Sequence, residues 1–496
     1  MCFFPICLFA QKYDYHWISN YSAIPNNSLN FDFNITPTTI SSETIPMPIL
    51  FANISMSDFD GNLLFYSNGI QVMNAENELM ENGDSLNWCD LTEDYYGQGI
   101  VSSSFMGIPA PGSDSLYYLI CNVIDYDTTG IMLYAAKNIL YSKIDVSANN
   151  GQGKVIAKDV LIGKANQFAE FSNACKHGNG RDWWYIVGED TASIYYRTLL
   201  TPDGFSNLDI QEIGFQPPFS ESRDGEGQNI FSPDGTKYVD FDPWNGVRIF
   251  DFDRCTGQLS NPVLITFPEK LIFGAGAAIS PNSRFLYVDS DTAIFQFDLW
   301  ASDIAASKDT VAIWDGFYSP GTISPTGFWV MQLMPDGKIY IITGSNPYYH
   351  YIANPDVKGD SCNVVQHELE LPSLLATIPT FPNYRLYDLP GSPCDTLGID
   401  GPPVAVKELE LPEGEIVISP NPASGSLHIN SVNCAWQPRE VAIYDVLGRE
   451  VLRRAHPASV RSFTLTLPFW ANEIYFVQIN LNNGRSVMHK ILVQNH

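Results

Sequence analysis

Two groups of polar residues in this chain have side chains of the types that acid–base catalysis needs. The first is His177 with Asp182 and Arg181, on an expected turn between two strand-like segments. An imidazole titrates near neutral pH and a carboxylate can orient it, so the pair has the composition of a general base and its partner. A polar hairpin turn uses the same residue types, and we favour that structural interpretation.

The second group is a run of charges just before an expected strand, at Glu221, Arg223, Asp224 and Glu226. A loop in this position can face the centre of a repeat fold and bind a cation or a polar ligand. A solvated loop explains the same charges more simply. The candidates for catalysis are thus His177, Asp182 and Glu226, and those for binding are Arg223, Asp224 and Glu226.

Some carboxylates are spaced like ligands of a calcium ion. Asp58, Asp60 and Asn62 alternate like the first three ligands of a calcium loop, but position twelve is Gly69 instead of Glu. Asp60-Gly61 also suits a tight hairpin. Two further pairs are Asp240 with Asp242 and Asp251 with Asp253. We predict no metal site and no cofactor, and leave open weak structural calcium binding.

The sequence contains none of the common local catalytic motifs. A Walker loop, G-x-G-x-x-G, H-E-x-x-H and G-x-S-x-G are all missing. The absence of these motifs does not exclude an enzyme, because a repeat fold can assemble a catalytic site from loops that are distant in the sequence. Enzyme activity stays open, and we favour its absence.

Composition and charge indicate a globular protein rich in strands. The chain has 496 residues, 45% of them hydrophobic and 13% aromatic, with a net charge of −28. So acidic a chain lacks the cations that neutralise phosphates, which makes nucleic acid an unsuitable partner. Residues 1–10 resemble the end of a secretory signal peptide, and no other stretch approaches the ~20 apolar residues of a membrane helix.

Cysteine usage fits an exported protein. Seven cysteines follow residue 10, and none form a C-x-x-C pair, which argues against a zinc ribbon or a thioredoxin-type site. Disulfides among the six that precede residue 400 suit an oxidising compartment, although their pairing does not follow from the sequence.

A turn followed by an aromatic-rich strand recurs six times, at intervals of 48 to 66 residues. The turns are Asp60-Gly61, Ser113-Asp114, Asn179-Gly180, Asp234-Gly235, Asn282-Ser283 and Asp336-Gly337. Each is expected to join the first two strands of a four-stranded blade, so residues 11–393 are predicted to form an all-β propeller. Pairing of residues 15–18 with 384–387 would complete a further blade, so we favour seven blades over six.

This region resembles secreted β-propeller proteins of Bacteroidota. The similarity lies in residues 54–69, 109–118, 175–177, 181–184 and 381–386 and covers most of residues 12–390. These motifs are structural, and the family has no common activity that the resemblance could transfer.

The last 81 residues differ in charge and pattern. Residues 394–415, rich in Gly, Pro and acidic side chains, are expected to be a linker. Residues 416–496 contain seven Lys or Arg against four Asp or Glu and six alternating segments, which predicts a small Ig-like β-sandwich.

This tail is similar to the type A sorting domain of the type IX secretion system. The similarity lies in residues 419–425, 444–449, 474–477 and 490–493, with one departure at 470–473, where the family has a Gly before the Ile-Tyr pair. The motif residues are Pro420, Asn421, Pro422, Gly448, Arg449, Tyr475 and Lys490. The resemblance implies that the secretion machinery is a partner, and that the protein passes through the periplasm to the cell surface or the medium and loses its tail.

Two functions remain open for the propeller. The first is a secreted or surface-attached binding or scaffold protein, with an extracellular polysaccharide or a surface protein as ligand. The alternative is a hydrolase or lyase that acts on an extracellular polysaccharide at the mouth of the propeller channel.

Overall fold

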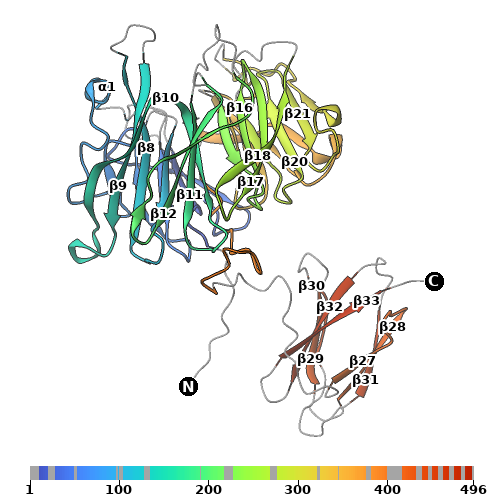
Figure 1. Ribbon diagram of the computed structural model, residues 1–496. Coiled ribbons are helices and arrows are strands. Elements are labelled where there is room, and N and C mark those ends of the chain that lie inside the picture. The colour runs from blue at the N-terminus through green and yellow to red at the C-terminus, as the bar shows by residue number, and fades with distance from the viewer. Residues whose placement is uncertain are drawn as a thin grey trace. The chain divides into compact units, whose positions relative to one another are not determined.

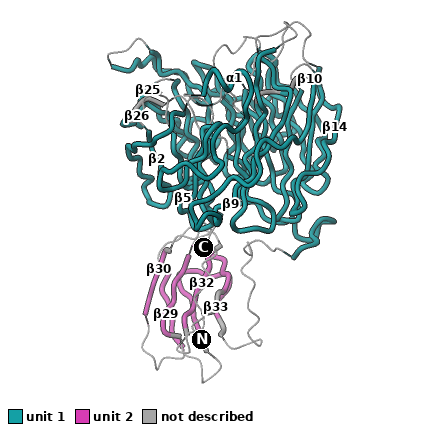
Figure 2. Tube along the Cα trace, turned by 90° about the vertical axis from the view of Figure 1, so that its left-hand side faces the viewer, with its two compact units in different colours: residues 1–400 teal, residues 401–496 magenta. Residues whose placement is uncertain are grey.

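A computed structural model describes most of the chain in two compact units, Met1–Asp400 (unit 1) and Gly401–His496 (unit 2), shown in Figure 2. The described residues are 11–19, 28–49, 53–96, 99, 104–127, 134–189, 192–216, 227–267, 276–320, 324–344, 346–375, 381–398, 416–431, 438–444, 450–455, 462–467, 474–481 and 486–493. The expected signal segment 1–10 lies outside them, and each unit is treated by itself.

Three sheets of unit 1 are four-stranded, antiparallel and wound in chain order (Figure 1). The first contains β15 (Gln228–Phe231), β16 (Lys237–Asp242), β17 (Gly246–Asp253) and β18 (Gln258–Ile265). The second contains β19 (Ala277–Ile279), β20 (Phe285–Asp289), β21 (Ala293–Asp298) and β22 (Asp309–Ile313). The third contains β23 (Met331–Leu333), β24 (Ile339–Ile341), β25 (Asn346–Ile352) and β26 (Val364–Leu375).

An eight-stranded sheet precedes them and divides at one long strand, β10 (Lys154–Lys176). The first half of β10 pairs with β9, the second half pairs with β11, and Phe168 pairs on both sides. One half therefore holds β7 (Phe105–Pro109), β8 (Leu116–Tyr126) and β9 (Tyr134–Asp145). The other holds β11 (Trp183–Glu189), β12 (Ile194–Thr201), β13 (Gly204–Phe205) and β14 (Asp209–Glu212).

Two three-stranded sheets begin unit 1. They are β1 (His16–Ser19), β2 (Ser28–Asp32) and β3 (Thr39–Glu43), then β4 (Ile54–Ser57), β5 (Leu63–Ser67) and β6 (Val72–Asn74). The helical elements are short: α1 (Asp90–Asp94), η1 (Asn149–Gly151), η2 (Ala305–Ser307) and η3 (Gly359–Cys362).

Five of the six predicted turns join the first and second strands of a sheet, as expected, and Asn179-Gly180 joins β10 to β11 at the start of the second half of the eight-stranded sheet. Gly235 illustrates why the residue type matters, because its φ of +70° lies in the left-handed region that side chains with a Cβ disfavour. The adjacent Asp234 accepts hydrogen bonds from the backbone N–H (3.0 Å) and the hydroxyl (2.9 Å) of Thr236. The turn chemistry therefore sets the register of the hairpin.

The sheets pack around their first strands, which confirms the predicted all-β propeller. β1 lies beside β4 and β4 beside β7, and β10, β15, β19 and β23 likewise follow one another. Apolar side chains fill the space between neighbouring sheets, such as Val239, Ile249, Leu286 and Phe297 between β15–β18 and β19–β22. Seven blades stay a prediction, because two sheets contain three described strands where a complete blade has four.

Ring closure differs from the prediction. We expected residues 15–18 to pair with 384–387, but β1 pairs with β2, and residues 381–390 form no strand. The two segments meet through side chains instead: Trp17 packs on Phe381 with ring centroids 5.4 Å apart, and Tyr13 on Tyr384 at 5.5 Å. The prediction of a strand clasp is wrong: β1 uses its backbone to pair with β2, and aromatic side chains fill the contact with the later segment.

Unit 1 also extends further than the sequence indicates. Cys394, where we expected the linker to begin, forms a disulfide with Cys255, and the compact unit ends at Asp400. The first residues of the expected linker therefore belong to unit 1.

Unit 2 is a sandwich of two antiparallel sheets, as the alternation predicts. One contains β27 (Ile416–Ser419), β28 (Ser426–Ser431) and β31 (Ser462–Thr466). The other contains β30 (Glu450–Ala455), β29 (Pro438–Tyr444), β32 (Ile474–Leu481) and β33 (Ser486–Leu492). Buried Leu427, Ile429, Val441 and Val477 pack in its core.

Candidate functional sites

His177 is held in the hairpin between β10 and β11, and both of its ring nitrogens are engaged. Nδ1 faces the backbone N–H of Asn179 at 3.0 Å and must accept, so Nε2 carries the proton and donates to the carbonyl of Cys255 at 3.0 Å. The ring is buried and lies against Trp184, with centroids 5.8 Å apart. A proton transfer by His177 would break one of these two bonds.

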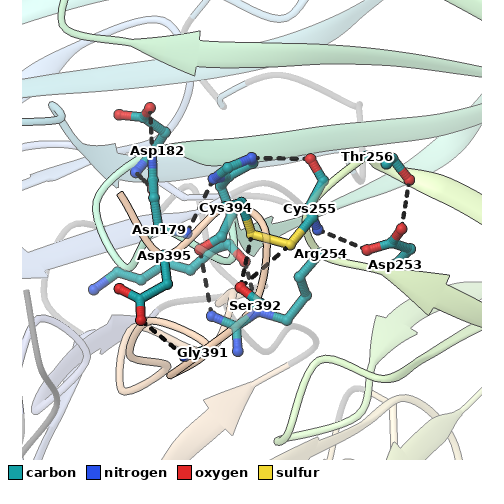
Figure 3. The surroundings of a disulfide bond; sticks show 12 residues. Asn179, Asp182, Asp253, Arg254, Cys255, Thr256, Gly391, Ser392, Cys394 and Asp395 are labelled. Carbon is teal, nitrogen blue, oxygen red and sulfur yellow. Dashed lines mark hydrogen bonds between the residues drawn. A yellow bond between two sulfur atoms is a disulfide. The ribbon is translucent and has the colours of Figure 1, made fainter. Parts of the chain in front are cut away.

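Asp182 is likewise tied into the hairpin (Figure 3). Its carboxylate accepts from Nε of Arg181 at 2.7 Å and from Nδ2 of Asn179 at 2.8 Å, and it is buried. The bond to Asp182 in turn raises the pKa of the Arg181 guanidinium. Asp182 meets His177 through the backbone, where its carbonyl accepts from the His177 N–H at 2.8 Å, while its carboxylate is bonded to Arg181 and Asn179. This geometry supports the structural interpretation. Arg223, Asp224 and Glu226 lie outside the described residues.

The calcium-like spacing at Asp58 forms a turn. Oδ1 of Asp58 accepts from the backbone N–H groups of Asp60 (2.9 Å) and Asn62 (2.8 Å), and Oδ2 from Nδ2 of Asn62 (2.9 Å). Asp242 likewise caps the turn between β16 and β17, where its carboxylate accepts from the backbone N–H of Trp244 at 2.8 Å. In the part of the chain that the structure describes, no three His, Cys, Asp or Glu residues are grouped to hold a metal ion.

Residues 381–387 form a closing segment that packs against the first strands of unit 1. Tyr384 is fully buried, its hydroxyl donates to the carbonyl of Gly107 at 2.7 Å, and burial raises its pKa well above the usual value. Arg385 pairs with the buried Asp14 through two bonds of 2.6 and 3.1 Å. Nδ2 of Asn383 donates to the carbonyl of Pro233 at 2.6 Å. The segment thereby joins the start of unit 1 to sheets in its middle.

A disulfide fastens the chain just after this segment (Figure 3). Cys394 bonds to Cys255, which lies 139 residues earlier in the turn after β17. The neighbouring Arg254 donates to the carbonyls of Lys176 and Tyr387, so the same turn also binds the closing segment. Among the described residues, Cys89, Cys121, Cys175 and Cys362 are not part of a disulfide.

Reduction of this disulfide is expected to destabilise unit 1. A cross-link over 139 residues restricts the unfolded chain, and native disulfides contribute about 2–4 kcal/mol. We expect a reductant such as TCEP to lower the melting temperature by about 2–5 °C, because 1 kcal/mol shifts the midpoint by roughly 1 °C in a unit of about 400 residues. Scanning calorimetry with and without TCEP measures it. The double variant C255S/C394S is the control, because it has no disulfide at this place to reduce. If TCEP lowered the melting temperature of this variant by the same amount, the effect would not come from the Cys255–Cys394 disulfide.

A cavity of about 380 Å³ lies between the closing segment and strands β15, β19 and β23, each the first strand of its sheet. Its apolar wall includes Ile230, Phe231, Ala277, Ile279, Met331 and Leu333. Gln228 links the same strands, since its Oε1 accepts from the N–H groups of Ala277 (2.9 Å) and Met331 (3.0 Å).

The polar side chains of this cavity already have protein partners. Asn173 donates to the carbonyl of Asn229 at 2.7 Å, and Gln332 to that of Leu333 at 3.2 Å. Asn383, Arg385 and Asp14 are bonded as described above. A polar ligand would therefore compete with existing bonds, so the cavity is better suited to stabilising the ring than to polar recognition.

Two buried carboxylates have structural roles that the sequence did not indicate: Asp240 was noted only as one of a pair with Asp242, and Asp289 was not selected. Asp240 accepts from the hydroxyl of Tyr195 at 2.6 Å and lies 3.6 Å from Nη1 of the buried Arg248, so it belongs to the interface between two sheets. Asp289 accepts from the N–H of Gly276 at 2.9 Å, and burial raises its pKa well above the usual value. Nothing in local spacing distinguishes these residues from exposed strand ends.

The sorting motif of unit 2 brings together residues from both ends of the domain. Asn421 donates through Nδ2 to the carbonyl of Lys490 at 3.2 Å and accepts at Oδ1 from the N–H of Leu492 at 2.9 Å. Ala423 N–H donates to the carbonyl of Leu492 at 2.7 Å. The segment of Pro420 and Pro422 thus lies along the end of β33, where Lys490 is exposed, while Tyr475 is buried in β32. Gly448 and Arg449 lie outside the described residues.

An all-β propeller followed by a sandwich with this motif defines a class of exported proteins. Residues 417–494 match the model of the secretion system C-terminal sorting domain. Unit 2 is therefore a sorting domain of the type IX secretion system, and the protein is exported to the cell surface or secreted. No described helix has the length and apolar character needed to cross a membrane.

Solved structures similar to this chain share little of its sequence. A putative 6-phosphogluconolactonase from Bacteroides uniformis is 13% identical, with 71% of this chain and 96% of that chain covered and a TM-score of 0.42. The periplasmic gluconolactonase of Pseudomonas aeruginosa is 12% identical, with 72% and 96% covered and a TM-score of 0.39. The Dos1 propeller is 12% identical, with 74% and 83% covered and a TM-score of 0.38. No curated protein matches the chain significantly. Likeness at this level carries no functional argument.

Proposed function

We propose that unit 1 is a binding or scaffold domain without catalytic turnover, which unit 2 delivers to the cell surface or the medium. The proposal is supported by the hydrogen bonds that already engage the polar side chains of unit 1. His177 and Asp182, the described candidates for acid–base chemistry, are both bonded to other protein groups: His177 to the carbonyl of Cys255, and Asp182 to Asn179 and Arg181. The polar groups of the cavity are bonded to each other or to backbone atoms.

The ligand of such a domain is an extracellular polysaccharide or a surface protein. Export places unit 1 where these polymers occur, and its acidic composition disfavours nucleic acid. A propeller offers a broad rigid surface for contacts of this kind, since its loops stand on a packed ring.

A glycan array combined with a product assay tests the proposal. We expect the purified protein to retain at least one extracellular polymer and to release no shortened or unsaturated products from it. Product formation that Glu226→Gln abolishes would contradict the proposal and establish a hydrolase or lyase in its place.

A further inference from the structure

Two aromatic side chains near helix α1 form an exposed platform on unit 1, defined here as Trp88 and Tyr96. Trp88 is 45% exposed and Tyr96 39% exposed. Their ring centroids lie 5.6 Å apart with an angle of 69° between the rings. Exposed Trp and Tyr side chains in contact with each other mark a recognition surface more often than scattered apolar residues do.

The ring of Tyr96 is fixed in place before any ligand binds. Its hydroxyl lies 3.0 and 2.9 Å from the two carboxylate oxygens of Asp84. Asp84 is itself oriented by Nε2 of Gln71 at 3.2 Å and by the N–H of Ser85 at 2.9 Å. A ring held in this way loses little conformational entropy when a ligand stacks on it.

The backbone beneath the platform is also fastened. α1 packs against β8 (Figure 1), and its Leu91 N–H donates to Oδ1 of Asp125 at 3.2 Å. Asn87, which precedes Trp88, donates through its N–H to Asp159 at 2.8 Å and through Nδ2 to the carbonyl of Gly69 at 2.8 Å. The backbone beneath the platform is therefore attached at three separate places, on β8, on β10 and on the turn between β5 and β6.

A third exposed aromatic residue flanks the helix. Tyr126, 38% exposed at the end of β8, donates its hydroxyl to Oδ2 of Asp94 at 2.6 Å. Asp94 is the last residue of α1, two residues before Tyr96. The aromatic rings thus alternate with carboxylates that retain acceptor capacity, because a carboxylate has about four lone-pair sites.

The charge around the platform limits which polymer fits. Residues 71–96 contain seven acidic residues and no Lys or Arg. Nζ of Lys158 lies nearby but donates to the backbone carbonyl of Asp84. A polyanion such as a uronate or phosphate polymer would meet carboxylates here, and like charges in close contact are unfavourable.

From this geometry we infer that the platform of Trp88 and Tyr96 binds a neutral polysaccharide. The C–H face of a hexose ring stacks on an aromatic ring, and its hydroxyls donate to the carboxylates of Asp84 and Asp94. The inference rests on the proposed function and specifies its ligand class and its site.

Affinity electrophoresis through gels that contain single polysaccharides tests this inference. Neutral probes are β-glucan, xylan and galactomannan, and acidic probes are alginate and polygalacturonate. We expect retardation by at least one neutral probe and weaker binding by a factor of ten or more in Trp88→Ala and Tyr96→Ala. Tyr96→Phe keeps the ring and is expected to retain most of the binding.

Trp300→Ala is the matched control. Trp300 is 62% exposed, and its ring is covered only in part by Arg284, at 5.2 Å from the guanidinium carbon. This variant should bind as the unaltered protein does, and melting curves should show that all variants are folded.

Three results would overturn the inference. One is unchanged binding of a neutral probe in both alanine variants, which would leave the proposed binding function intact. The others are retardation by acidic probes only, or by none of the five polysaccharides. Release of products from a bound probe would instead contradict the proposed function, so the two failures are distinguishable.

Discussion

Removal of residues 416–496 is expected to retain unit 1 in the periplasm. Unit 2 is a sorting domain with its own core, built around Leu427, Ile429, Val441 and Val477. Unit 1 should fold without it, because it forms a separate compact unit with its own hydrophobic clusters. Fractionation of cells that produce the full and the truncated chain measures the effect, and we expect export to fall below detection.

A point variant gives an independent test of the same role. Ile443 is fully buried in β29, so Ile443→Asp places a charge in the core of the sandwich and should unfold unit 2 alone. This variant should be retained like the truncation, while a change of the exposed Val451 in β30 to Ala, outside the motif, should not be. Truncated protein in the medium or on the cell surface would show that unit 1 is exported by another signal.

The repeats of unit 1 were predictable because their signal is local. A turn such as Asp234-Gly235 needs a residue that tolerates a positive φ, and the strand that follows it is rich in aromatic and β-branched residues. The same reasoning located six strands of unit 2 but missed β30. Two of the six residues of β30 are Arg, and it lies at the edge of its sheet, where Arg453 pairs with Glu440. Charged edge strands lack the alternation that identifies strands with a buried face.

Closure of the ring could not be predicted, because its contacts join residues far apart in the sequence. The hydroxyl of Tyr384 donates to the carbonyl of Gly107, and Arg385 pairs with Asp14. The strand-like composition of this stretch led to the wrong prediction of a paired strand. Its aromatic residues are there to fill space between sheets, and local periodicity does not distinguish that role from a place in a sheet.

The candidate site was also predicted only in part: the sequence indicated residues of suitable type, but not the partners that they bind. Residue types alone selected His177 and Asp182, but the partners that occupy them, such as the carbonyl of Cys255, lie up to 78 residues away. Trp88 and Tyr96 were not selected, because neither lies in a strand pattern or a catalytic motif. The one available signal was a Trp and a Tyr in an acidic segment without strand alternation, and it gives no information about exposure.

Removal of the closing segment is expected to have the largest effect on the stability of unit 1. The comparison is between a chain that ends at residue 398 and one that ends at residue 380. The shorter chain loses Phe381 and Tyr384, both buried, and truncation of a large buried aromatic side chain costs about 3–5 kcal/mol. It also leaves the buried carboxylate of Asp14 without Arg385, and an unpaired buried charge costs about as much.

These losses are not additive, but together they approach the whole stability of a typical domain, about 5–15 kcal/mol. We therefore expect the chain ending at residue 398 to melt cooperatively and the chain ending at residue 380 to melt at least about 10 °C lower or without a cooperative transition. Cys394→Ser in the longer chain is the control, since it removes the disulfide and leaves the closing segment. Equal melting of the two truncated chains would mean that the sheets β1–β3 and β23–β26 close the ring without the segment. Their own contact, with the rings of Phe31 and Tyr349 at 6.4 Å, would then be sufficient.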